Sequence, residues 1–497
     1  MLLFAISISN GFSQQKNVVF IIVDDLKPLL GSFEQKQIHS PNIDSLAAKS
    51  AIFTNAHTQQ AICGPSRISL LTGMRPDYTK VYDLKTYMRE MNPNILTLPE
   101  HFKNSDYQTV GMGKVFHMAK RDDPQSWTLP FIDERDLTYP EEFGAPVMKH
   151  YQLPAMKEQV ANFNEEDVDF DRDDLIKMGI HPSSECLDIP DNAYADGAMA
   201  IKSIELLNTF KNDEKPFFMT IGFHRPHLPF VAPKKYWDLY DRNTIEVAAY
   251  QKIAENSPSY AYHKSGELHN YSDIPADMDL KNPLEMDKQR ELIHGYYASV
   301  SYVDAQIGMV LDHLKTAGLA ENTVVVLVGD HGWHLGDHGL WNKHTNFEQA
   351  TRTPLIVFSP EMTNSTSIDA PTELVDVFPT MCDYAGISIP EHLHGQSLRP
   401  LISGEVSTLK PVAISQYPRN NLMGYTARSD RYRYTEWHKK GGIQEGIYEA
   451  KDIKDKELYD YVKDPLETKN LIDDPAYKEV VKEMRGYMKE RLAKETK

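Results

Sequence analysis

The chain has 497 residues, of which 41% are hydrophobic, so it can bury a large core and is not intrinsically disordered. Acidic residues outnumber basic residues by 71 to 53, and the formal net charge is −18. This acidic excess argues against nucleic acid or an anionic membrane as the main partner. The three cysteines, Cys63, Cys186 and Cys382, are too few for a disulfide framework, so nothing in the composition requires a disulfide.

The first residues have the pattern of a secretory signal. Residues 1–13 form a short apolar run that ends with the small residues Gly11 and Ser13, although the basic residues that usually precede such a run are missing. We therefore predict that residues 1–13 are a signal peptide and that the protein is exported, to the periplasm or the medium. No other apolar run is long enough to span a bilayer, so we expect no membrane insertion after the signal is removed.

The following part of the chain predicts an α/β fold. Apolar runs rich in β-branched residues predict strands of a mostly parallel sheet over residues 17–23, 108–112, 216–223, 323–328 and 354–358. Apolar residues at helical spacing predict helices ending at residue 49 and over residues 192–210, 287–317 and 373–384. Because strands and helices alternate, we expect one large domain over residues 14–395, with a large, mostly parallel central sheet flanked by helices.

Two polar segments interrupt this alternation. Residues 121–191 and 233–279 are weakly periodic, and we expect irregular insertions that cover the site or bind substrate. After a linker, short runs over residues 412–417, 424–428 and 432–437 predict a small antiparallel sheet. A last amphipathic run over residues 477–492 predicts a closing helix. We therefore expect residues 396–497 to form a smaller C-terminal α+β subdomain.

A reactive cysteine stands at a predicted helix start. Pro65 suits the first turn of a helix, Ser66 can cap backbone N–H groups there, and Gly73 is a natural terminator. Cys63 is therefore expected at the helix N-terminus, where unpaired N–H groups and the helix dipole favour anions, and Arg67 adds a positive charge one turn later. A buried free cysteine that only begins a helix is the alternative interpretation of this stretch taken alone.

Acidic residues follow two of the predicted strands. Asp24 and Asp25 come directly after residues 17–23, and Asp330 and His331 follow residues 323–328. Ligands in open α/β sheets gather at the carboxyl ends of the strands, so these side chains are placed to hold a metal ion. Mostly carboxylate oxygens select a hard ion such as calcium.

Zinc is the alternative metal. The spacing of His331, His334 and His338 could suggest a zinc site, but interleaved glycines make a regular helix unlikely there, and the chain has no H-E-x-x-H motif. Calcium or a similar hard ion is therefore the favoured prediction.

Basic residues follow two further predicted strands, and another basic residue lies in a loop. Lys114 and His117 come after residues 108–112, His224 follows residues 216–223, and Lys343 lies in a loop. Each of these residues alone would be assigned to the solvent-exposed surface. Their placement after strands of the same sheet favours a shared site instead.

Five motifs occur in the order and approximate spacing of a known family. They are V-D-D after the first strand, C-G-P-S-R, G-K-x-x-H, G-F-H-R-P-H and G-D-H-G-W, and S-Q-Y-P-R follows at residues 415–419. In these motifs the chain resembles the formylglycine-dependent sulfatase family of the alkaline-phosphatase superfamily, and within it the iduronate-2-sulfatases. The resemblance covers nearly the whole chain.

The resemblance implies an alkaline-phosphatase-like fold and hydrolysis of sulfate esters. It implies that a formylglycine-generating maturation enzyme oxidises Cys63 to formylglycine, whose hydrated aldehyde is the nucleophile. One calcium ion (Ca²⁺) would be held by this residue together with Asp24, Asp25, Asp330 and His331. The substrate would be a sulfated, uronate-containing polysaccharide or oligosaccharide, either an ulvan-like algal glycan or a glycosaminoglycan with 2-O-sulfated iduronate.

The resemblance also implies roles for the basic residues. Because the chain as a whole is acidic, a sulfated glycan must be met by local cations, and Lys114 and Lys343 would neutralise the sulfate oxygens while Arg67 fixes the nucleophile. His224 would protonate the departing sugar oxygen. His117 would then take the proton from the second hydroxyl of the nucleophile, so that sulfate leaves.

Two other functions fit part of this pattern. A phosphate mono- or diesterase of the same superfamily would share the fold and the metal carboxylates, although the complete C-x-P-S-R motif favours sulfate. A non-catalytic glycan-binding homologue would be expected to have lost one of the polar residues named above, and all of them are present.

Overall fold

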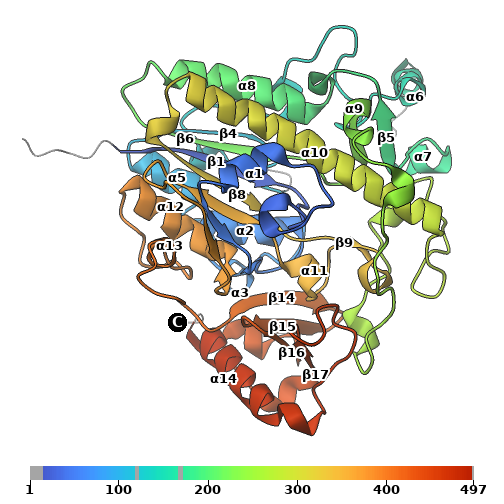
Figure 1. The fold of residues 1–497 in the computed structure, drawn as a ribbon, viewed down its shortest axis with the longest axis vertical. Coiled ribbons are helices and arrows are strands. Elements are labelled where there is room, and N and C mark those ends of the chain that lie inside the picture. Colours follow the sequence, from blue (N-terminus) through green and yellow to red (C-terminus); the bar gives the residue numbers. More distant parts are fainter. Residues whose placement is uncertain (1–14, 118–122, 166–171, 495–497) are drawn as a thin grey trace, which may run out of the picture.

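The computed structural model describes residues 15–117, 123–165 and 172–494. The predicted signal peptide lies outside the described residues. Figure 1 shows a large α/β body and, below it, a smaller sheet that packs on helix α14 (Lys478–Lys494). This confirms the predicted fold class, a mostly parallel α/β domain with a smaller C-terminal part.

Seven strands form the central sheet, in the spatial order β12-β2-β11-β8-β1-β6-β4. They are β1 (Asn17–Val23), β2 (Ala51–Phe53), β4 (Gln108–Gly113), β6 (Phe217–Phe223), β8 (Thr323–Gly329), β11 (Leu355–Phe358) and β12 (Thr366–Ile368). Strand β11 is antiparallel to both neighbours, and the other neighbouring pairs are parallel. The sheet is therefore mostly parallel, as predicted.

Alternate side chains of β1 belong to two separate cores. Val19 and Ile21 pack in one apolar cluster, Phe20 and Ile22 pack in another, and all four are fully buried. A strand buried on both faces explains the unbroken apolar run in the sequence.

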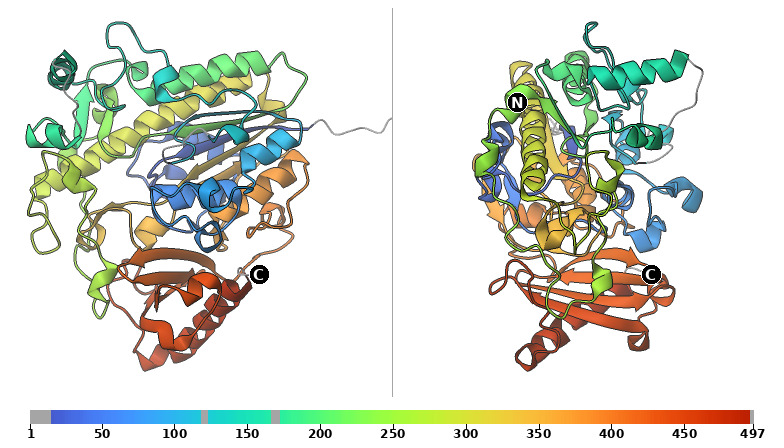
Figure 2. Two further views of the ribbon diagram at one scale, coloured as in Figure 1. Left: turned by 180° about the vertical axis from the view of Figure 1, so that it is seen from behind. Right: turned by 90° about the vertical axis from the view of Figure 1, so that its right-hand side faces the viewer.

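Helices cover both faces of the sheet (Figure 1, Figure 2). Residues of α1 (Pro41–Ala47), α8 (Ala195–Phe210) and α10 (Met286–Thr316) contribute to the first cluster, and residues of α2 (Cys63–Thr72), α5 (Leu98–Asn104) and α12 (Val377–Ala385) contribute to the second. The structure also contains the short helices α3 (Pro76–Thr79), α4 (Met88–Met91), α9 (Lys234–Trp237), α11 (Glu348–Thr351) and α13 (Arg399–Ile402). Three two-stranded sheets complete the body: β3 (Ala56–His57) with β13 (Thr372–Glu373), β5 (Ser184–Leu187) with β7 (Phe230–Pro233), and β9 (His334–Leu335) with β10 (Trp341–Asn342).

The first polar insertion is more regular than we expected. Residues 121–191 contain α6 (Pro154–Glu165), α7 (Arg172–Lys177) and β5, so the prediction of an irregular segment was wrong in part. A buried carboxylate organises this region, because Glu185 accepts hydrogen bonds from the backbone N–H groups of Gln152 and Leu153, both at 2.8 Å, and from Tyr194 Oη at 2.6 Å. Polar contacts of this kind leave no apolar periodicity in the sequence.

The C-terminal part is a four-stranded antiparallel sheet of β14 (Ala413–Arg419), β15 (Leu422–Arg428), β16 (Tyr432–Lys439) and β17 (Ile453–Asp460). Its core includes Met423 and Tyr434 from the sheet and Met484 and Met488 from α14. Strand β17 was not predicted, because its sequence I-K-D-K-E-L-Y-D is mostly charged.

A buried charge cluster joins this part to the α/β body. The carboxylate of Glu373, which is fully buried, accepts hydrogen bonds from Arg75 Nη2 at 2.5 Å, Lys410 Nζ at 2.7 Å and Arg491 Nη2 at 2.9 Å. It also accepts the backbone N–H of Ile414 in β14 at 2.8 Å. The cluster therefore connects α14 and β14 to the segment that precedes α3.

Candidate active site

The ends of four parallel strands bring polar residues to one edge of the sheet. Strand β1 pairs in parallel with β8 and with β6, and β6 pairs in parallel with β4. The residues that directly follow these strands are Asp24, Asp25, Asp330, His331, His224 and Lys114. All of them were predicted as site residues.

A glycine lets Lys114 approach the neighbouring strand. A Cβ atom on Gly222 of β6 would lie 2.1 Å from the carbonyl oxygen of Lys114, a backbone contact that no rotamer change could relieve. The backbone N–H of Lys114 donates to the carbonyl of Gly222 at 2.8 Å. Glycine is therefore required where β4 leaves the sheet and delivers Lys114.

Helix α2 begins at Cys63 and ends before Gly73, whose φ of 65° lies in the left-handed region, as the sequence predicted. The prediction for Ser66 was wrong, because no side chain caps this helix and Ser66 Oγ donates to the carbonyl of Asp330 instead. Ser66 therefore ties the first turn of α2 to the end of β8. No side-chain hydrogen bond caps the N-terminus of α2.

Cys63 lies at the centre of the polar cluster. Its Sγ atom is 3.3 Å from His331 Nε2, 3.9 Å from Asp25 Oδ1 and 3.8 Å from Lys114 Nζ. Burial and the charge of Asp24 raise the pKa of the Cys63 thiol well above its ordinary value. The unmodified thiol is therefore protonated at neutral pH and is a poor nucleophile.

The cluster around Cys63 fits a metal ion. Two groups of residues could each supply ligands, and within each group the ligand atoms lie within 4.8 Å of one another. One group is Asp24, Asp25, Cys63 and His227, and the other is Cys63, Asp330 and His331. Burial raises the pKa of Asp25 to about 7, and the charge of Asp24 adds to the increase although Lys343 opposes it. A cation among these buried carboxylates would relieve that repulsion, and their oxygen atoms suit a hard divalent ion.

Arg67 holds two of the carboxylates. Its Nη2 donates to Asp24 Oδ1 and its Nε donates to Asp330 Oδ2, both at 2.9 Å, and Nη1 donates to the carbonyl of Lys114. Burial alone would raise the pKa of Asp24, but the charges of Lys114 and Arg67 outweigh burial and keep it well below its ordinary value. The contacts of Arg67 therefore fix the carboxylates, whereas the resemblance implied that it fixes the nucleophile.

Two lysines approach the cluster from different segments. Lys114 Nζ pairs with Asp24, and Lys343 Nζ lies 3.1 Å from Asp25 Oδ2 and 4.7 Å from the centroid of the Trp333 ring. Both lysine side chains are almost completely buried. Burial alone would lower their pKa values, but the surrounding carboxylates raise both above the ordinary value, so both ammonium groups are charged.

The structure adds His227 and Glu267 to the predicted residues. His227 Nε2 is 3.8 Å from Asp25 Oδ2 and 3.1 Å from Glu267 Oε1, and Lys343 Nζ donates to the same Glu267 oxygen at 2.9 Å. His227 belongs to the G-F-H-R-P-H motif, so the sequence contained an indication that it lies near the site. Glu267 lies in the insertion over residues 233–279, where no sequence pattern indicated a site.

The two predicted proton-transfer residues follow strands of the sheet, but among the described residues neither belongs to the groups of ligand atoms around Cys63, so the structure brings neither of them into that cluster. His224 Nε2 is 2.6 Å from Glu134 Oε1, and its backbone N–H donates to Asp196 Oδ1 at 2.9 Å. His117 follows β4 by four residues and is half-buried. Among the described histidines, His227 and His331 are the ones that approach the carboxylates around Cys63.

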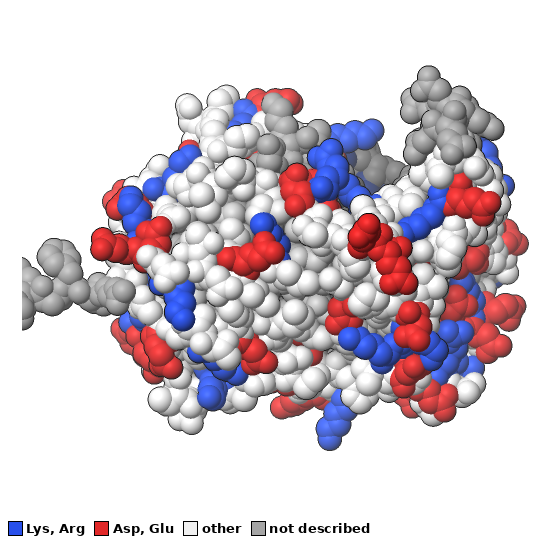
Figure 3. Space-filling model, turned by 90° about the horizontal axis from the view of Figure 1, so that it is seen from above, with Lys and Arg blue, Asp and Glu red and all other residues white. Residues whose placement is uncertain are grey.

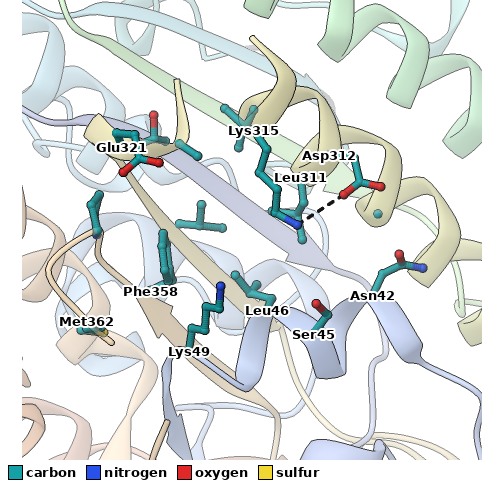
Figure 4. Close-up of a pocket in the computed structure, with 16 residues that line it drawn as sticks. Asn42, Ser45, Leu46, Lys49, Leu311, Asp312, Lys315, Glu321, Phe358 and Met362 are labelled. Carbon is teal, nitrogen blue, oxygen red and sulfur yellow. Dashed lines mark hydrogen bonds and ion pairs between the residues drawn. The ribbon is translucent and has the colours of Figure 1, made fainter. Parts of the chain in front are cut away.

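A separate cavity of about 370 Å³ lies at the opposite ends of the strands (Figure 4). Leu46 and Lys49 come from the segment after β1, Leu311 and Lys315 come from α10, and Phe358 ends the antiparallel strand β11. One of its two lysines pairs with an acidic neighbour, as Lys315 Nζ lies 3.4 Å from Asp312 Oδ1. The cavity contains none of the residues that surround Cys63, and so it is not part of the candidate active site.

The surface seen from above carries interspersed charges of both signs (Figure 3). The described residues form no broad basic area on the face seen in this view. Across the described residues, no helix has both the length and the apolar character needed to cross a membrane.

Comparison with known families identifies the chain. Residues 16–387 match the family described as Sulfatase, which is most of the chain. The chain belongs to the sulfatase family. This sulfatase is accordingly a sulfuric ester hydrolase, and its residues 336–495 also match the family described as N-sulphoglucosamine sulphohydrolase, C-terminal.

Curated relatives extend over nearly the whole sulfatase chain. Iduronate 2-sulfatase of Homo sapiens is 32% identical over 538 aligned positions, which cover 94% of this chain and 92% of the human enzyme. A sulfatase of Formosa agariphila is 29% identical, covering 95% of this chain and 86% of that protein, and an ulvan-active sulfatase of the same organism is 24% identical, covering 96% and 81%.

Solved structures share the fold. A protein bound to its substrate D-glucosamine-2-N,6-O-disulfate superposes with a TM-score of 0.72 at 20% identity, covering 97% of this chain and 98% of that one. The phosphonate monoester hydrolase of Agrobacterium radiobacter gives a TM-score of 0.71 at 20% identity, covering 97% and 96%. At such low identity these neighbours show the fold alone.

Proposed function

We propose that this sulfatase removes sulfate from a sulfated, uronate-containing polysaccharide or oligosaccharide, with a formylglycine derived from Cys63 as its nucleophile. The observation that carries this proposal is the position of Cys63, at the N-terminus of α2, which no side chain caps, and between Lys114 and the carboxylates. A cysteine that only began a helix would not need two buried lysines beside it. A formylglycine-generating maturation enzyme would act on the chain before it becomes active.

We further propose that the cluster holds one calcium ion, with Asp24, Asp25, Asp330, His331 and the modified Cys63 as its ligands. A sulfate ester is a stable anion, and a bound divalent ion supplies positive charge to its oxygens during the reaction. The carboxylates of Asp24 and Asp330 are held in place for this ion by Arg67. Zinc remains the alternative that a metal analysis must exclude.

The protein's own cations would then bind the sulfate group. Lys114 and Lys343 are charged and buried, so their attraction for sulfate oxygens is weakened little by water. The leaving sugar oxygen needs a proton donor, and the candidates are the imidazole of His227, which lies beside Asp25, and that of His224, which directly follows β6. We retain the assignment of the acid to His224 and of the base to His117 as part of the proposal.

The substrate class is supported by the relatives. Iduronate 2-sulfatase and the ulvan-active sulfatase are named for sulfated substrates, and uronate-containing glycans are the class that we infer for this chain. The acidic net charge of the chain and the two buried lysines favour a substrate that is bound through its sulfate group at the cluster around Cys63. The pattern of residues 1–13 supports export of the protein, which would bring it to polysaccharides outside the cell.

Matched esters test this function. The matured enzyme should release sulfate from sulfated oligosaccharides of glycosaminoglycan or ulvan much faster than it releases phosphate from the corresponding phosphate esters. The Cys63→Ala variant, checked for unchanged thermal unfolding, should release neither. Preferential cleavage of the phosphate esters, or sulfate release by Cys63→Ala at near-normal rate, would contradict the proposal.

A further inference from the structure

The C-terminal sheet places one arginine beside the active-site segments. The backbone N–H of Gln416 in β14 donates to the carbonyl of Gln59 at 2.7 Å, and Ser415 Oγ donates to the carbonyl of Thr58 at 2.6 Å. Strand β14 therefore runs alongside the segment that leads to Cys63. Arg419 is the last residue of this strand.

Arg419 also contacts the loop that carries the active-site lysine. Its Nη2 donates to the carbonyl of His344, the residue after Lys343, and the His344 ring lies 6.0 Å from the ring of Tyr417. The backbone N–H of His344 in turn donates to the carbonyl of Ala61 at 3.1 Å. Arg419 thus lies where the loop that carries Lys343 meets the segment that leads to Cys63.

The guanidinium of Arg419 has no acidic partner among the residues that the structure describes. Its other contacts are the carbonyl of Pro418, 3.2 Å from Nη1, and the ring of Tyr417, whose centroid is 4.5 Å away. The buried Nε atom has no hydrogen-bond partner. Burial lowers the pKa of Arg419, although the Tyr417 side chain opposes this effect.

Several buried arginines in this protein have an acidic partner. Arg67, Arg75, Arg428 and Arg433 each pair with a carboxylate, whereas the guanidinium of the buried Arg225 donates to the carbonyls of His227 and Pro229 and to His150 Nδ1. Arg419 is half-buried and has fewer such acceptors. A partly desolvated guanidinium without a counter-ion is costly, because it loses hydration without gaining an opposite charge, so an anion beside Arg419 would be stabilised.

His263 lies in the same region. Its Nδ1 accepts the backbone N–H of Ser265 at 2.8 Å, and its ring interacts with the backbone of Lys343. The rings of His263 and His344 are 5.8 Å apart. His263, His344 and Arg419 therefore lie together beside the loop of Lys343.

We infer that Arg419 recognises a carboxylate on the sugar that carries the scissile sulfate ester. A guanidinium forms two parallel hydrogen bonds with a carboxylate, which an ammonium group cannot do, so the residue type suits a uronate. The sulfate group would be bound by Lys114 and Lys343 while the carboxylate is bound by Arg419. This inference rests on the proposed function, because it assigns a specificity residue for a uronate-containing substrate of the same site.

The experiment compares a sulfated uronate disaccharide with its methyl ester, in which the carboxylate charge is removed. Wild-type enzyme should lose about 10- to 100-fold in kcat/KM on esterification, the range expected for hydrogen bonds to a charged group. Arg419→Ala should lose a similar factor on the free acid and should no longer distinguish the two substrates. Arg419→Lys should restore only part of the preference, because it retains the charge without the planar pair of donors.

A matched control removes an exposed cation that directly follows β16. Lys440, which is exposed and donates to the carbonyl of Asn420 at 2.8 Å, lies beside the turn after β14, and Lys440→Ala should retain the wild-type preference. Thermal unfolding of every variant checks the fold. A structural role alone for Arg419 predicts that Arg419→Ala lowers kcat/KM equally for both substrates, and that result would overturn the inference.

The remaining outcomes separate the inference from the proposed function. If wild-type enzyme cleaves the disaccharide and its methyl ester equally well, the proposed function stands and the assignment of Arg419 is wrong. A different outcome is that Arg419→Ala loses a preference for substrates that carry a second sulfate group while it still distinguishes the free acid from the methyl ester. In that case the assignment of Arg419 to the carboxylate is also wrong. If wild-type enzyme cleaves a simple aryl sulfate but no uronate disaccharide, both the substrate class and the assignment fail.

Discussion

Lys343 Nζ lies 2.9 Å from Glu267 Oε1, which joins the loop of the active-site lysine to a residue 76 positions earlier in the chain. The same oxygen of Glu267 lies 3.1 Å from His227 Nε2. Burial alone would raise the pKa of Glu267, but the charge of Lys343 outweighs it and keeps that pKa well below the ordinary value. Glu267 is therefore ionised and positions both side chains beside the cluster.

Removal of this acceptor should impair turnover. Glu267→Ala leaves Lys343 and His227 without a shared partner, and we expect a loss of about tenfold in kcat, the effect of a small misplacement of catalytic groups. Glu267→Gln keeps an oxygen at this position and should retain more activity than the alanine variant. Steady-state kinetics measure both, with Glu255→Ala as a control at an exposed glutamate paired with Lys469. Equal kinetics of Glu267→Ala and wild type would show that the contact has no positioning role.

Loss of the lysine itself should affect binding and turnover together. Lys343→Ala removes a buried cation that would touch sulfate in the ground state and in the transition state, so KM should rise and kcat should fall. We expect kcat/KM to drop by about 100-fold or more, as for the loss of a preorganised charged donor. An unchanged KM for a small sulfate ester would place the sulfate elsewhere in the site.

Metal binding should depend on the carboxylates at both strand ends. Calcium should raise the thermal midpoint of the wild-type protein, and a ligand at 100 times its Kd adds about 2.7 kcal/mol to the free energy of unfolding. Asp330→Asn removes one carboxylate that Arg67 holds, and the calcium-dependent increase should disappear or become much smaller. Differential scanning calorimetry with calcium, zinc and chelator measures this without reference to activity. An undiminished response of the variant, or tight stoichiometric zinc in the purified protein, would exclude the proposed ion.

The buried cluster that joins the two bodies should control stability. Glu373→Gln leaves Arg75, Lys410 and Arg491 with less negative charge, and breaking such a buried pair costs about 3–5 kcal/mol of unfolding free energy. Burial alone would raise the pKa of Glu373, but the three cations outweigh burial and hold it well below its ordinary value. Denaturant unfolding of both proteins measures the difference.

This cluster also predicts the sign of a pH dependence. Because the folded-state pKa of Glu373 is lowered, its contribution is fully present above the unfolded pKa of about 4.3 and is lost as pH falls toward the folded value. The stability gap between wild type and Glu373→Gln should therefore be constant near neutral pH and should narrow below about pH 4. A gap that widened on acidification would contradict the assignment of charge to Glu373.

Strand ends account for what could be predicted from the sequence. Buried parallel strands leave continuous apolar runs, and the polar residues that follow such runs must meet at one edge of the sheet. Asp24, Asp330 and Lys114 were found in this way, and each lies in the cluster around Cys63.

Residues on loops could not be predicted in the same way. Glu267 reaches the cluster from a segment of short turns, and its partners are fixed by tertiary packing, which leaves no periodicity in the sequence. For the same reason the unpaired state of Arg419 became visible only when its neighbours were known. Strand β17 was missed because its charged residues resemble an exposed loop.

The chemical state of Cys63 tests the central claim most directly. Trypsin cleaves after Lys49 and Arg67, so the peptide over residues 50–67 contains Cys63 and reports its mass. Preparations made with and without a formylglycine-generating enzyme would contain different fractions of aldehyde at this position. We predict that the rate of sulfate release per molecule is proportional to the aldehyde fraction and vanishes when the peptide is entirely thiol. Full activity in a preparation whose peptide contains only the unmodified cysteine would contradict the account.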